Sequence, residues 1–472
     1  MTLTTRRILY IGFIIIFFIA APPLVLYTAG FRYDFQYNRV VETGSLVISS
    51  NPSGAEIYLD GELYKEVTPT IINTILPGKI NLLVQKEGHY SWKKEIEIQP
   101  RVTTFEEHIT LFKDTKPMAI TEHALVQYWW NRSHTLLAYA AEDNTLRLFN
   151  TLNQKDTLIA NSADASSVTL SWSKNRDQFF FNRNTTQGNK EFIIVATQSP
   201  ERIIPLSDIS TKSFNSLQWD PVSKTTLYGT TDSGDLMRLN YLLHTEHLIA
   251  EGPVTQYLVE EKRIILIAKN TSGKLYLAWI NPSDRDTVHL LPEILVTHYD
   301  TFIPSNSHYI AIKNQDTNTL RIIDPGALPP LSNEAIVSIA GVKNAYWTDD
   351  GNTLVYSDGF GIYTQTFTTP ISVLPNQKET SNLVTRYSKQ IRELAISGNG
   401  RHVFYTIENE LRVSELNSFD DPRSIILYSG TNTMSGLRYS SQNNSLTFID
   451  GDGILQTLAL SQENLRSFPF GN

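Results

Sequence analysis

Residues 347–356 read WTDDGNTLVY, and this stretch decides the fold because its pattern recurs along most of the chain. An aromatic residue opens the pattern, a polar turn follows, and a short apolar strand ends in a second aromatic residue nine positions later. Close copies run from Trp130 to Tyr139, from Trp172 to Phe181 and from Trp219 to Tyr228. Weaker copies that keep the separation run from Tyr257 to Leu266, Ile303 to Ile312, Ile396 to Tyr405 and Tyr439 to Phe448.

The eight copies begin 38 to 49 residues apart, with a mean spacing of about 44. That period is typical of a propeller blade built from four strands. A pair of β-sandwiches would not impose so even a period. We therefore predict a mainly β protein with a β-propeller over residues 119–472, with eight blades favoured and seven blades plus one irregular insertion as the alternative.

The copy from Trp347 to Tyr356 resembles the repeat of TolB-like and related WD40-like propellers. That repeat reads Trp-Ser-Pro-Asp-Gly, two variable residues, then an apolar and an aromatic residue separated by one position. The Asp-Gly turn is degenerate in the other copies of this chain. The resemblance therefore supports the propeller fold without selecting a subfamily.

An uncharged run at residues 8–31 predicts a membrane span. As a helix, its 24 residues would extend roughly 36 Å, enough for a hydrocarbon core of about 30 Å. Arg6 and Arg7 precede the run and favour a cytoplasmic location for residues 1–7. The rest of the chain is then extracytoplasmic, with interfacial aromatic residues at Tyr27, Phe31, Tyr33, Phe35 and Tyr37.

A cleaved signal peptide is the alternative interpretation of this run, because Ile8 to Ala21 would make an adequate apolar segment. Pro22 directly follows Ala21, however, which leaves Thr28-Ala29-Gly30 as the nearest small-residue cleavage site. We therefore favour a retained single-pass anchor.

Composition narrows the class of protein. The chain has 472 residues, no cysteine, and 40 basic against 48 acidic residues, a net charge of -8. This charge has the wrong sign for binding nucleic acid over a wide surface. An exported domain without disulfides fits a bacterial cell envelope. Asn-x-Ser/Thr sequons at Asn131, Asn184, Asn270 and Asn443 are attributed to chance.

Residues 44–100 alternate short strand-like runs with turn residues and predict a small β-sandwich, flanked by a linker at 32–43 and by a linker or closing strand at 101–118. Its buried face is predicted from residues at period two: Val47, Ile57, Leu59, Leu82, Val84, Ile96 and Ile98. The stretch resembles the PEGA domain, an immunoglobulin-like module of exported bacterial and archaeal proteins. The resemblance is carried, in order, by the segments 44–48, 51–55 (Asn-Pro-Ser-Gly-Ala, with Ser53 in place of the family's Glu), 57–61, 68–69, 76–78 and 86–90. It implies a stalk, or a contact with wall polymers, and no catalytic activity.

The sequence contains only weak signals for catalytic or metal-binding residues. His244 and His247 are expected on a strand, where they would point to opposite faces. The Asp450-Gly-Asp452-Gly453 run lacks the later acidic ligands of a calcium loop and predicts a hairpin turn. Other acidic residues beside Gly or Ser are interpreted as turn residues: Asp232, Asp235, Asp349, Asp350 and Asp358. The periodic tryptophans are expected to pack between blades rather than to stack on sugars, and we predict no catalytic, cofactor-binding or metal-binding residue.

Architecture and the absence of catalytic motifs together predict a membrane-tethered binding or scaffolding protein of the cell envelope. Its propeller would contact a protein or a wall polymer. The alternative is a propeller enzyme that acts on envelope glycans through carboxylates in its channel. A calcium-dependent adhesin is a third hypothesis.

Overall fold

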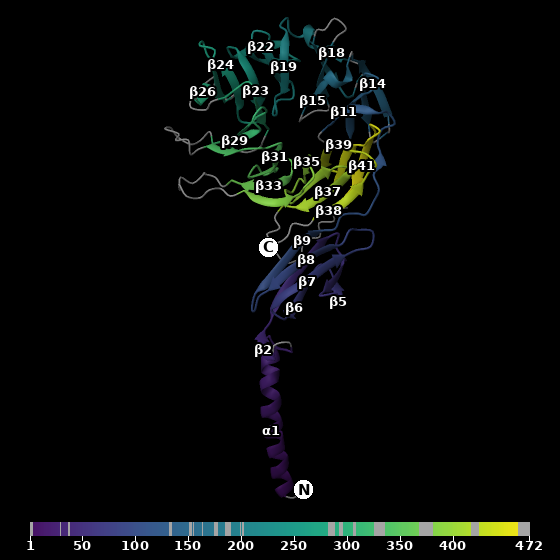
Figure 1. The fold of residues 1–472 in the computed structure, drawn as a ribbon, viewed down its shortest axis with the longest axis vertical. Coiled ribbons are helices and arrows are strands. Elements are labelled where there is room, and N and C mark those ends of the chain that lie inside the picture. The colour runs from purple at the N-terminus through teal and green to yellow at the C-terminus, as the bar shows by residue number, and fades with distance from the viewer. Residues whose placement is uncertain are drawn as a thin grey trace. The chain divides into compact units, whose positions relative to one another are not determined.

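The computed structural model describes residues 3–460 except 29, 36–37, 132–134, 151–152, 154, 163, 174–177, 185–189, 199, 201–202, 282–287, 292–295, 305–307, 325–335, 368–380 and 417–423. The chain forms two compact units, which we describe separately (Figure 1). Unit 1 comprises Met1–Lys116 and Ala459–Asn472, and unit 2 comprises Pro117–Leu458.

Unit 1 begins with a single apolar helix, α1 (Leu3–Thr28), which runs through Pro22 and Pro23. Its segment Leu9–Thr28 has a mean hydropathy of 2.5, is not buried against the rest of the protein, and is long enough to cross a membrane. The helix ends earlier than the uncharged run predicts. Gly30 adopts φ +88° and its N–H donates to the carbonyl of Tyr27 at 3.3 Å, so the chain leaves the helix before Phe31.

A short hairpin follows the helix. Strands β1 (Phe31–Asp34) and β2 (Arg39–Glu42) pair antiparallel within the segment predicted as a linker. Asn38, at φ +49°, stands just before β2, where asparagine tolerates the left-handed conformation better than most residues. The chain therefore leaves the helix as ordered structure.

The rest of unit 1 is a β-sandwich of two sheets. Strands β6 (Thr70–Ile75), β3 (Gly44–Asn51) and β9 (Thr103–Thr110) form one sheet in that order. The other contains, in order, β5 (Glu62–Val67), β4 (Glu56–Leu59), β7 (Gly78–Gln85) and β8 (Trp92–Ile98). β9 pairs in parallel with β3, so the segment predicted as a linker or closing strand supplies a strand, and the sandwich continues beyond residue 100.

The sandwich core confirms most of the predicted face and corrects one position. Ile57, Leu82, Val84, Ile96 and Ile98 are buried together, with Leu59 packed against them. Val47 is buried as predicted, but it lies outside this cluster. Its neighbours Leu46 and Ile48 are buried within the cluster instead, because successive side chains of a strand point to opposite faces.

Unit 2 consists of antiparallel four-stranded sheets that follow one another along the chain. Sheet 1 contains β11 (Leu125–Trp130), β12 (Leu136–Ala141), β13 (Thr145–Asn150) and β14 (Lys155–Asn161); sheet 2 contains β15 (Thr169–Trp172), β16 (Gln178–Asn184), β17 (Lys190–Ala196) and β18 (Ile203–Pro205). Sheet 3 contains β19 (Phe214–Trp219), β20 (Thr226–Thr231), β21 (Leu236–Asn240) and β22 (Thr245–Ala250); sheet 4 contains β23 (Val254–Val259), β24 (Ile264–Lys269), β25 (Leu275–Ile280) and β26 (Val288–Leu291). Two short 3₁₀ helices, η1 (Ala165–Ser167) and η2 (Leu206–Asp208), lie in this half.

The second half of unit 2 repeats the arrangement. Sheet 5 contains β27 (Asp300–Ile303), β28 (Ile310–Asn314), β29 (Thr319–Ile323) and β30 (Ile336–Ile339); sheet 6 contains β31 (Asn344–Trp347), β32 (Thr353–Ser357), β33 (Gly361–Thr366) and β34 (Asn382–Arg386). Sheet 7 contains β35 (Ile391–Ile396), β36 (His402–Ile407), β37 (Glu410–Glu415) and β38 (Ser424–Ser429). Sheet 8 contains β39 (Ser435–Ser440), β40 (Ser445–Ile449), β41 (Leu455–Ala459) and, as its outer strand, β10 (Met118–Ala119).

Neighbouring sheets pack face to face, and the last sheet packs against the first. Separate clusters of buried apolar side chains join each sheet to the next from sheet 1 to sheet 7. Stacked rings of Phe404 and Tyr439 join sheets 7 and 8. One further cluster holds Leu125 and Leu137 of sheet 1 with Ile449 and Leu455 of sheet 8. Together with the pairing of β10 to β41, this succession is that of a β-propeller closed by strands from both ends of the unit.

Each sequence repeat begins in the inner strand of its sheet. Repeat starts fall at the last residue of β11, β15, β19, β27, β31 and β35, and within β23 and β39. Parts of the turns in the copies that begin at Trp130, Trp172 and Ile303 lie outside the described residues. The mainly β fold is confirmed. The described sheets match the larger of the two predicted blade numbers, and the blade count itself stays a prediction.

Candidate functional site

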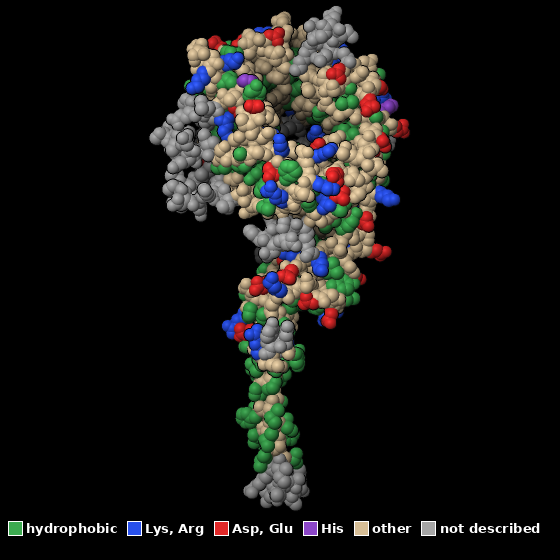
Figure 2. All heavy atoms as spheres, in the orientation of Figure 1, with side chains coloured by type: hydrophobic (Ala, Val, Ile, Leu, Met, Phe, Trp, Pro, Cys, Tyr) green, Lys and Arg blue, Asp and Glu red, His purple; other side chains and the backbone are tan. Residues whose placement is uncertain are grey.

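In each sheet of unit 2, the strand named first above lies on the inside of the ring of sheets, and we call it the inner strand. Six pairs of successive first strands contact each other: β11 with β15, β15 with β19, β19 with β23, β23 with β27, β31 with β35 and β35 with β39. Figure 2 shows a hollow in this unit, with lysine and arginine side chains near its rim. Most exposed side chains of the inner strands are polar: Thr169, Asn215, Thr255, Arg392, Ser435 and Arg438. Val126 and Tyr346 are the exposed apolar or aromatic ones.

Four residues from the inner strands of neighbouring sheets form a mixed polar and aromatic cluster, which we call the inner-strand cluster: Tyr346 of β31, Glu393 of β35, Arg438 of β39 and Tyr128 of β11. The Arg438 guanidinium lies 5.3 Å from the centre of the Tyr128 ring. The Tyr128 hydroxyl donates to the carbonyl of Gly436, so it ties sheet 1 to sheet 8. Glu393 interacts with Arg438 and with the backbone N–H groups of Gly436 and Leu437.

Burial raises the pKa values of three groups in this cluster. It raises the pKa of Tyr128 to about 12, although the Thr447 hydroxyl and Arg438 favour the phenolate. Burial also raises the pKa of Tyr346, and the charge of Glu393 adds to the shift. The pKa of Glu393 is raised as well, because burial of its carboxylate outweighs the attraction of the N–H groups and of Arg438. The cluster thus combines two neutral phenols, one cation and one carboxylate held partly out of water.

Other inner-strand side chains join neighbouring sheets. The Gln218 amide donates to the Tyr257 carbonyl at 2.8 Å and accepts from the Val259 N–H at 2.9 Å. Gln127 donates to the Ser166 carbonyl at 2.7 Å, and Asn344 donates to the carbonyl of Arg392 at 3.2 Å. These residues hold the ring together, so their polarity has a structural explanation.

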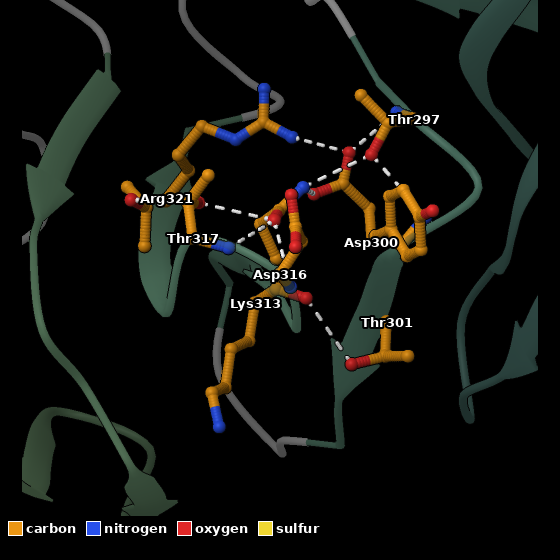
Figure 3. Close-up of polar contacts among 10 residues, drawn as sticks. Thr297, Asp300, Thr301, Lys313, Asp316, Thr317 and Arg321 are labelled. Atoms are coloured by element: carbon orange, nitrogen blue, oxygen red, sulfur yellow. Dashed lines mark hydrogen bonds and ion pairs between the residues drawn. The ribbon is translucent and has the colours of Figure 1, made fainter.

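A buried ion pair lies in sheet 5 (Figure 3). Asp300 is fully buried, and one of its carboxylate oxygens lies 2.9 Å from the Arg321 guanidinium. The same carboxylate accepts from the Thr297 N–H at 2.6 Å and from the Asn314 amide at 3.0 Å. Asn314 in turn accepts from the N–H groups of the turn at Asp316 and Thr317.

Asp300 is unusual for its position. It is the first residue of its inner strand, and the equivalent first residues of β11, β19, β23 and β35 are the buried apolar Leu125, Phe214, Val254 and Ile391. Its carboxylate is occupied by an arginine, an amide and an N–H, so it orders the sheet rather than facing a ligand.

The tryptophans have the role that the sequence predicts. Trp172 donates to the Trp129 carbonyl of the preceding sheet at 3.1 Å, and Trp219 donates to the Ser171 carbonyl at 2.9 Å. Trp347 stacks on Tyr309 of sheet 5, with ring centres 6.3 Å apart, and Trp130 packs where sheets 8 and 1 meet. Packing of these residues between sheets is therefore confirmed.

The predicted turn residues lie in turns or directly beside them, and three of their carboxylates accept N–H groups of the same turn. Asp350 accepts from the Asn352 N–H, Asp358 from the N–H groups of Phe360 and Gly361, and Asp450 from those of Asp452 and Ile454. The Thr348 hydroxyl and then the Asn352 N–H lower the pKa of Asp350, and the N–H groups of Gly361 and Phe360 lower the pKa of Asp358, in both cases against the opposing effect of burial.

Only one of the two histidines predicted to share a strand, His244 and His247, lies in that strand. His247 lies in β22, but His244 stands in the turn before it at φ +52°, so the strand begins one residue later than the sequence analysis assumed. Among the described residues, no group of three or more histidine and carboxylate side chains is arranged to hold a metal ion.

Sequence reasoning missed the inner-strand cluster and the Asp300 pair. The four cluster residues are spread from position 128 to position 438, and only closure of the ring brings them together. For Asp300 the repeats gave no such signal, because it lies three residues before Ile303, and at that offset the other copies carry mostly polar residues such as Gln127 and Asn344.

The sandwich of unit 1 matches a known domain family. Residues 43–114 match the family model of the PEGA domain. The chain is similar to the β-propeller domain of Myceliophteria thermophila Cps50 (Swd1), with 12% identity and a TM-score of 0.42 over 75% of this chain and 100% of that one. It is also similar to the C-terminal WD40 domain of Sif2, with 13% identity and a TM-score of 0.45 over 73% of this chain and 99% of that one. No curated protein matches the chain.

Proposed function

We propose that this chain is a membrane-anchored binding protein of a bacterial cell envelope. In this proposal α1 is a retained single-pass anchor, residues 1–7 stay in the cytoplasm, and the PEGA domain separates the anchor from a propeller that recognises a partner protein outside the cytoplasm. The exposed apolar helix supports the anchor, since so much apolar surface is stable in lipid and costly in water. Arg6 and Arg7 support its orientation.

The inner-strand cluster carries the binding part of the proposal. Tyrosine and arginine are the residue types enriched at the energetic centres of protein interfaces. Tyr346 is 43% exposed and Arg438 is exposed, both on strands that line the ring. A protein segment that covered them would bury a phenol ring and pair with a guanidinium whose position is already restrained by Tyr128 and Glu393.

The alternative of a glycan-cleaving enzyme finds less support. Glycoside hydrolysis generally requires two carboxylates that flank one bond. The eight inner strands carry two carboxylates, Asp300 and Glu393. Asp300 is enclosed by Arg321, and Glu393 is engaged by backbone N–H groups of the next sheet. No geometry among the described residues favours this chemistry.

Site-specific photocrosslinking on intact cells tests the binding proposal. A photoreactive benzoyl-phenylalanine replaces Tyr346, which it resembles in shape, and in the control variant it replaces Leu383. Both side chains belong to sheet 6, and Leu383 is 54% exposed on the outer strand β34. We expect a discrete protein adduct from position 346 and none from position 383, and the Arg438→Ala variant should weaken that adduct.

Three outcomes would contradict the proposal. An adduct from position 383 alone would place the interaction on the outer strands. A carbohydrate adduct from position 346 would indicate a wall polymer as the partner. The absence of any adduct at position 346, in cells that accumulate the variant normally, would exclude a protein partner at the inner strands.

A further inference from the structure

The hairpin β1–β2 places apolar and aromatic side chains together on one of its faces. Tyr33 pairs directly with Val40, so both side chains point to the same side of the hairpin. Phe35, two residues beyond Tyr33, contacts it edge to face with ring centres 5.0 Å apart. The exposed fractions of the three side chains are 47% for Tyr33, 82% for Phe35 and 52% for Val40. We call these three residues the hairpin apolar face.

The hairpin is attached firmly to the end of α1 (Figure 1). Arg32 donates to the carbonyls of Tyr27 and Phe31, each at 2.8 Å, and its guanidinium stacks 3.6 Å from the centre of the Tyr27 ring. The N–H and hydroxyl of Thr43 both donate to the Gly30 carbonyl, at 3.0 and 2.7 Å. These contacts hold the hairpin at the end of the helix, where Arg32 caps the Tyr27 carbonyl.

The other end of the hairpin is attached to the sandwich. Glu42 forms an ion pair with Arg101, and the Arg101 N–H donates to the Thr43 carbonyl at 3.1 Å. The segment between helix and sandwich is thus ordered on both sides. An exposed aromatic face in such a position is not a consequence of a loose linker.

We propose that the hairpin apolar face rests in the headgroup region of the outer leaflet, so that membrane lipid covers Tyr33, Phe35 and Val40. This inference rests on the proposed anchor. Polar headgroups occupy roughly 5–7 Å on each side of the hydrocarbon core, and β1 begins three residues after α1 ends. Tyrosine and phenylalanine partition well into this layer, and an arginine at its level can interact with lipid phosphates. The hairpin then acts as a second, shallow contact that restrains the tilt of the PEGA domain relative to the bilayer.

Single-cysteine spin labelling tests the inference, because the chain contains no cysteine of its own. The full chain is reconstituted in vesicles of phosphatidylcholine and phosphatidylglycerol, with a label at one position at a time. Phe35→Cys and Val40→Cys report on the apolar face. Arg39→Cys lies next to Val40 but on the opposite face of the strand. Ile16→Cys in α1 and Asp232→Cys in unit 2 are the lipid and water references. Collision rates with oxygen and with a water-soluble nickel chelate measure whether each label is in lipid or in water.

We expect the ratio of oxygen to nickel collisions at positions 35 and 40 to be higher than at positions 39 and 232 but lower than at position 16, because the headgroup layer lies between water and the hydrocarbon core. If position 16 is in lipid while 35 and 40 match 232, the hairpin inference is wrong and the anchor stands. If positions 35 and 40 are shielded from both reagents, protein rather than lipid covers the face, which also overturns the inference. If position 16 itself is in water, the anchor fails and the hairpin inference fails with it.

Discussion

Replacing Asp300 by alanine is expected to lower the free energy of unfolding of the propeller unit by about 3–5 kcal/mol, the usual cost of removing one partner from a buried ion pair. The Arg321 guanidinium would remain in a largely buried position without its closest carboxylate, and the Thr297 N–H and the Asn314 amide would each lose an acceptor. Urea unfolding followed by tryptophan fluorescence measures the effect, since all tryptophans except Trp92 belong to this unit.

Two further variants give this prediction its controls. Asp316→Ala changes an exposed acidic residue in the adjacent turn and should alter stability by less than about 0.5 kcal/mol. The double variant Asp300→Leu, Arg321→Met should recover most of the loss, because four other sheets already carry an apolar residue at the position of Asp300. A loss below about 1 kcal/mol for Asp300→Ala would show that the ion pair does not stabilise sheet 5 as described.

His402 makes the stability of the propeller fall in acid. It is buried at the start of β36, and burial, with the nearby charge of Arg401, lowers its pKa from 6.5 to about 4. Between these pH values the unfolded chain binds a proton that the folded chain does not, so stability falls as the pH drops from about 6.5 to 4. A shift of this size corresponds to about 3 kcal/mol.

His402→Gln should remove that component of the pH dependence. We expect the free energy of unfolding of the parent to fall by about 3 kcal/mol more than that of the variant when both are taken from pH 7 to pH 4. His244→Gln, which changes an exposed histidine in a turn, should behave as the parent does. Parallel pH profiles for parent and His402→Gln would mean that His402 accepts its proton in the folded state as readily as in the unfolded chain.

The features that sequence reasoning predicted well are those set by local periodicity. A repeat of about 44 residues with an aromatic residue at a fixed place predicts a series of similar β-sheets. Trp172 and Trp219 lie where two sheets meet, as that pattern predicts. The apolar run at residues 8–31 and the turn motifs of the PEGA domain are signals of the same local kind. Each of these signals depends only on neighbouring residues.

The features that were missed depend on register or on distant segments. Leu46, Val47 and Ile48 are all apolar and all buried, and only strand pairing decides which of them face the cluster between the two sheets. The sequence left open whether residues 101–118 form a linker or a closing strand, because the pairing of β9 with β3 is parallel and joins residues about 58 positions apart. Tyr128 and Arg438 meet only because the ring closes.

The proposed function requires residues 1–7 and the propeller to lie on opposite sides of a membrane. Thr4→Cys and Asp232→Cys, each the sole cysteine of its chain, can be treated in intact cells with a membrane-impermeant maleimide. We predict labelling at position 232 in intact cells and at position 4 only after permeabilisation, both on the full-length chain of 53.4 kDa. Labelling of position 4 from outside, its absence from the mature chain, or protection of position 232 in intact cells would contradict the proposed topology.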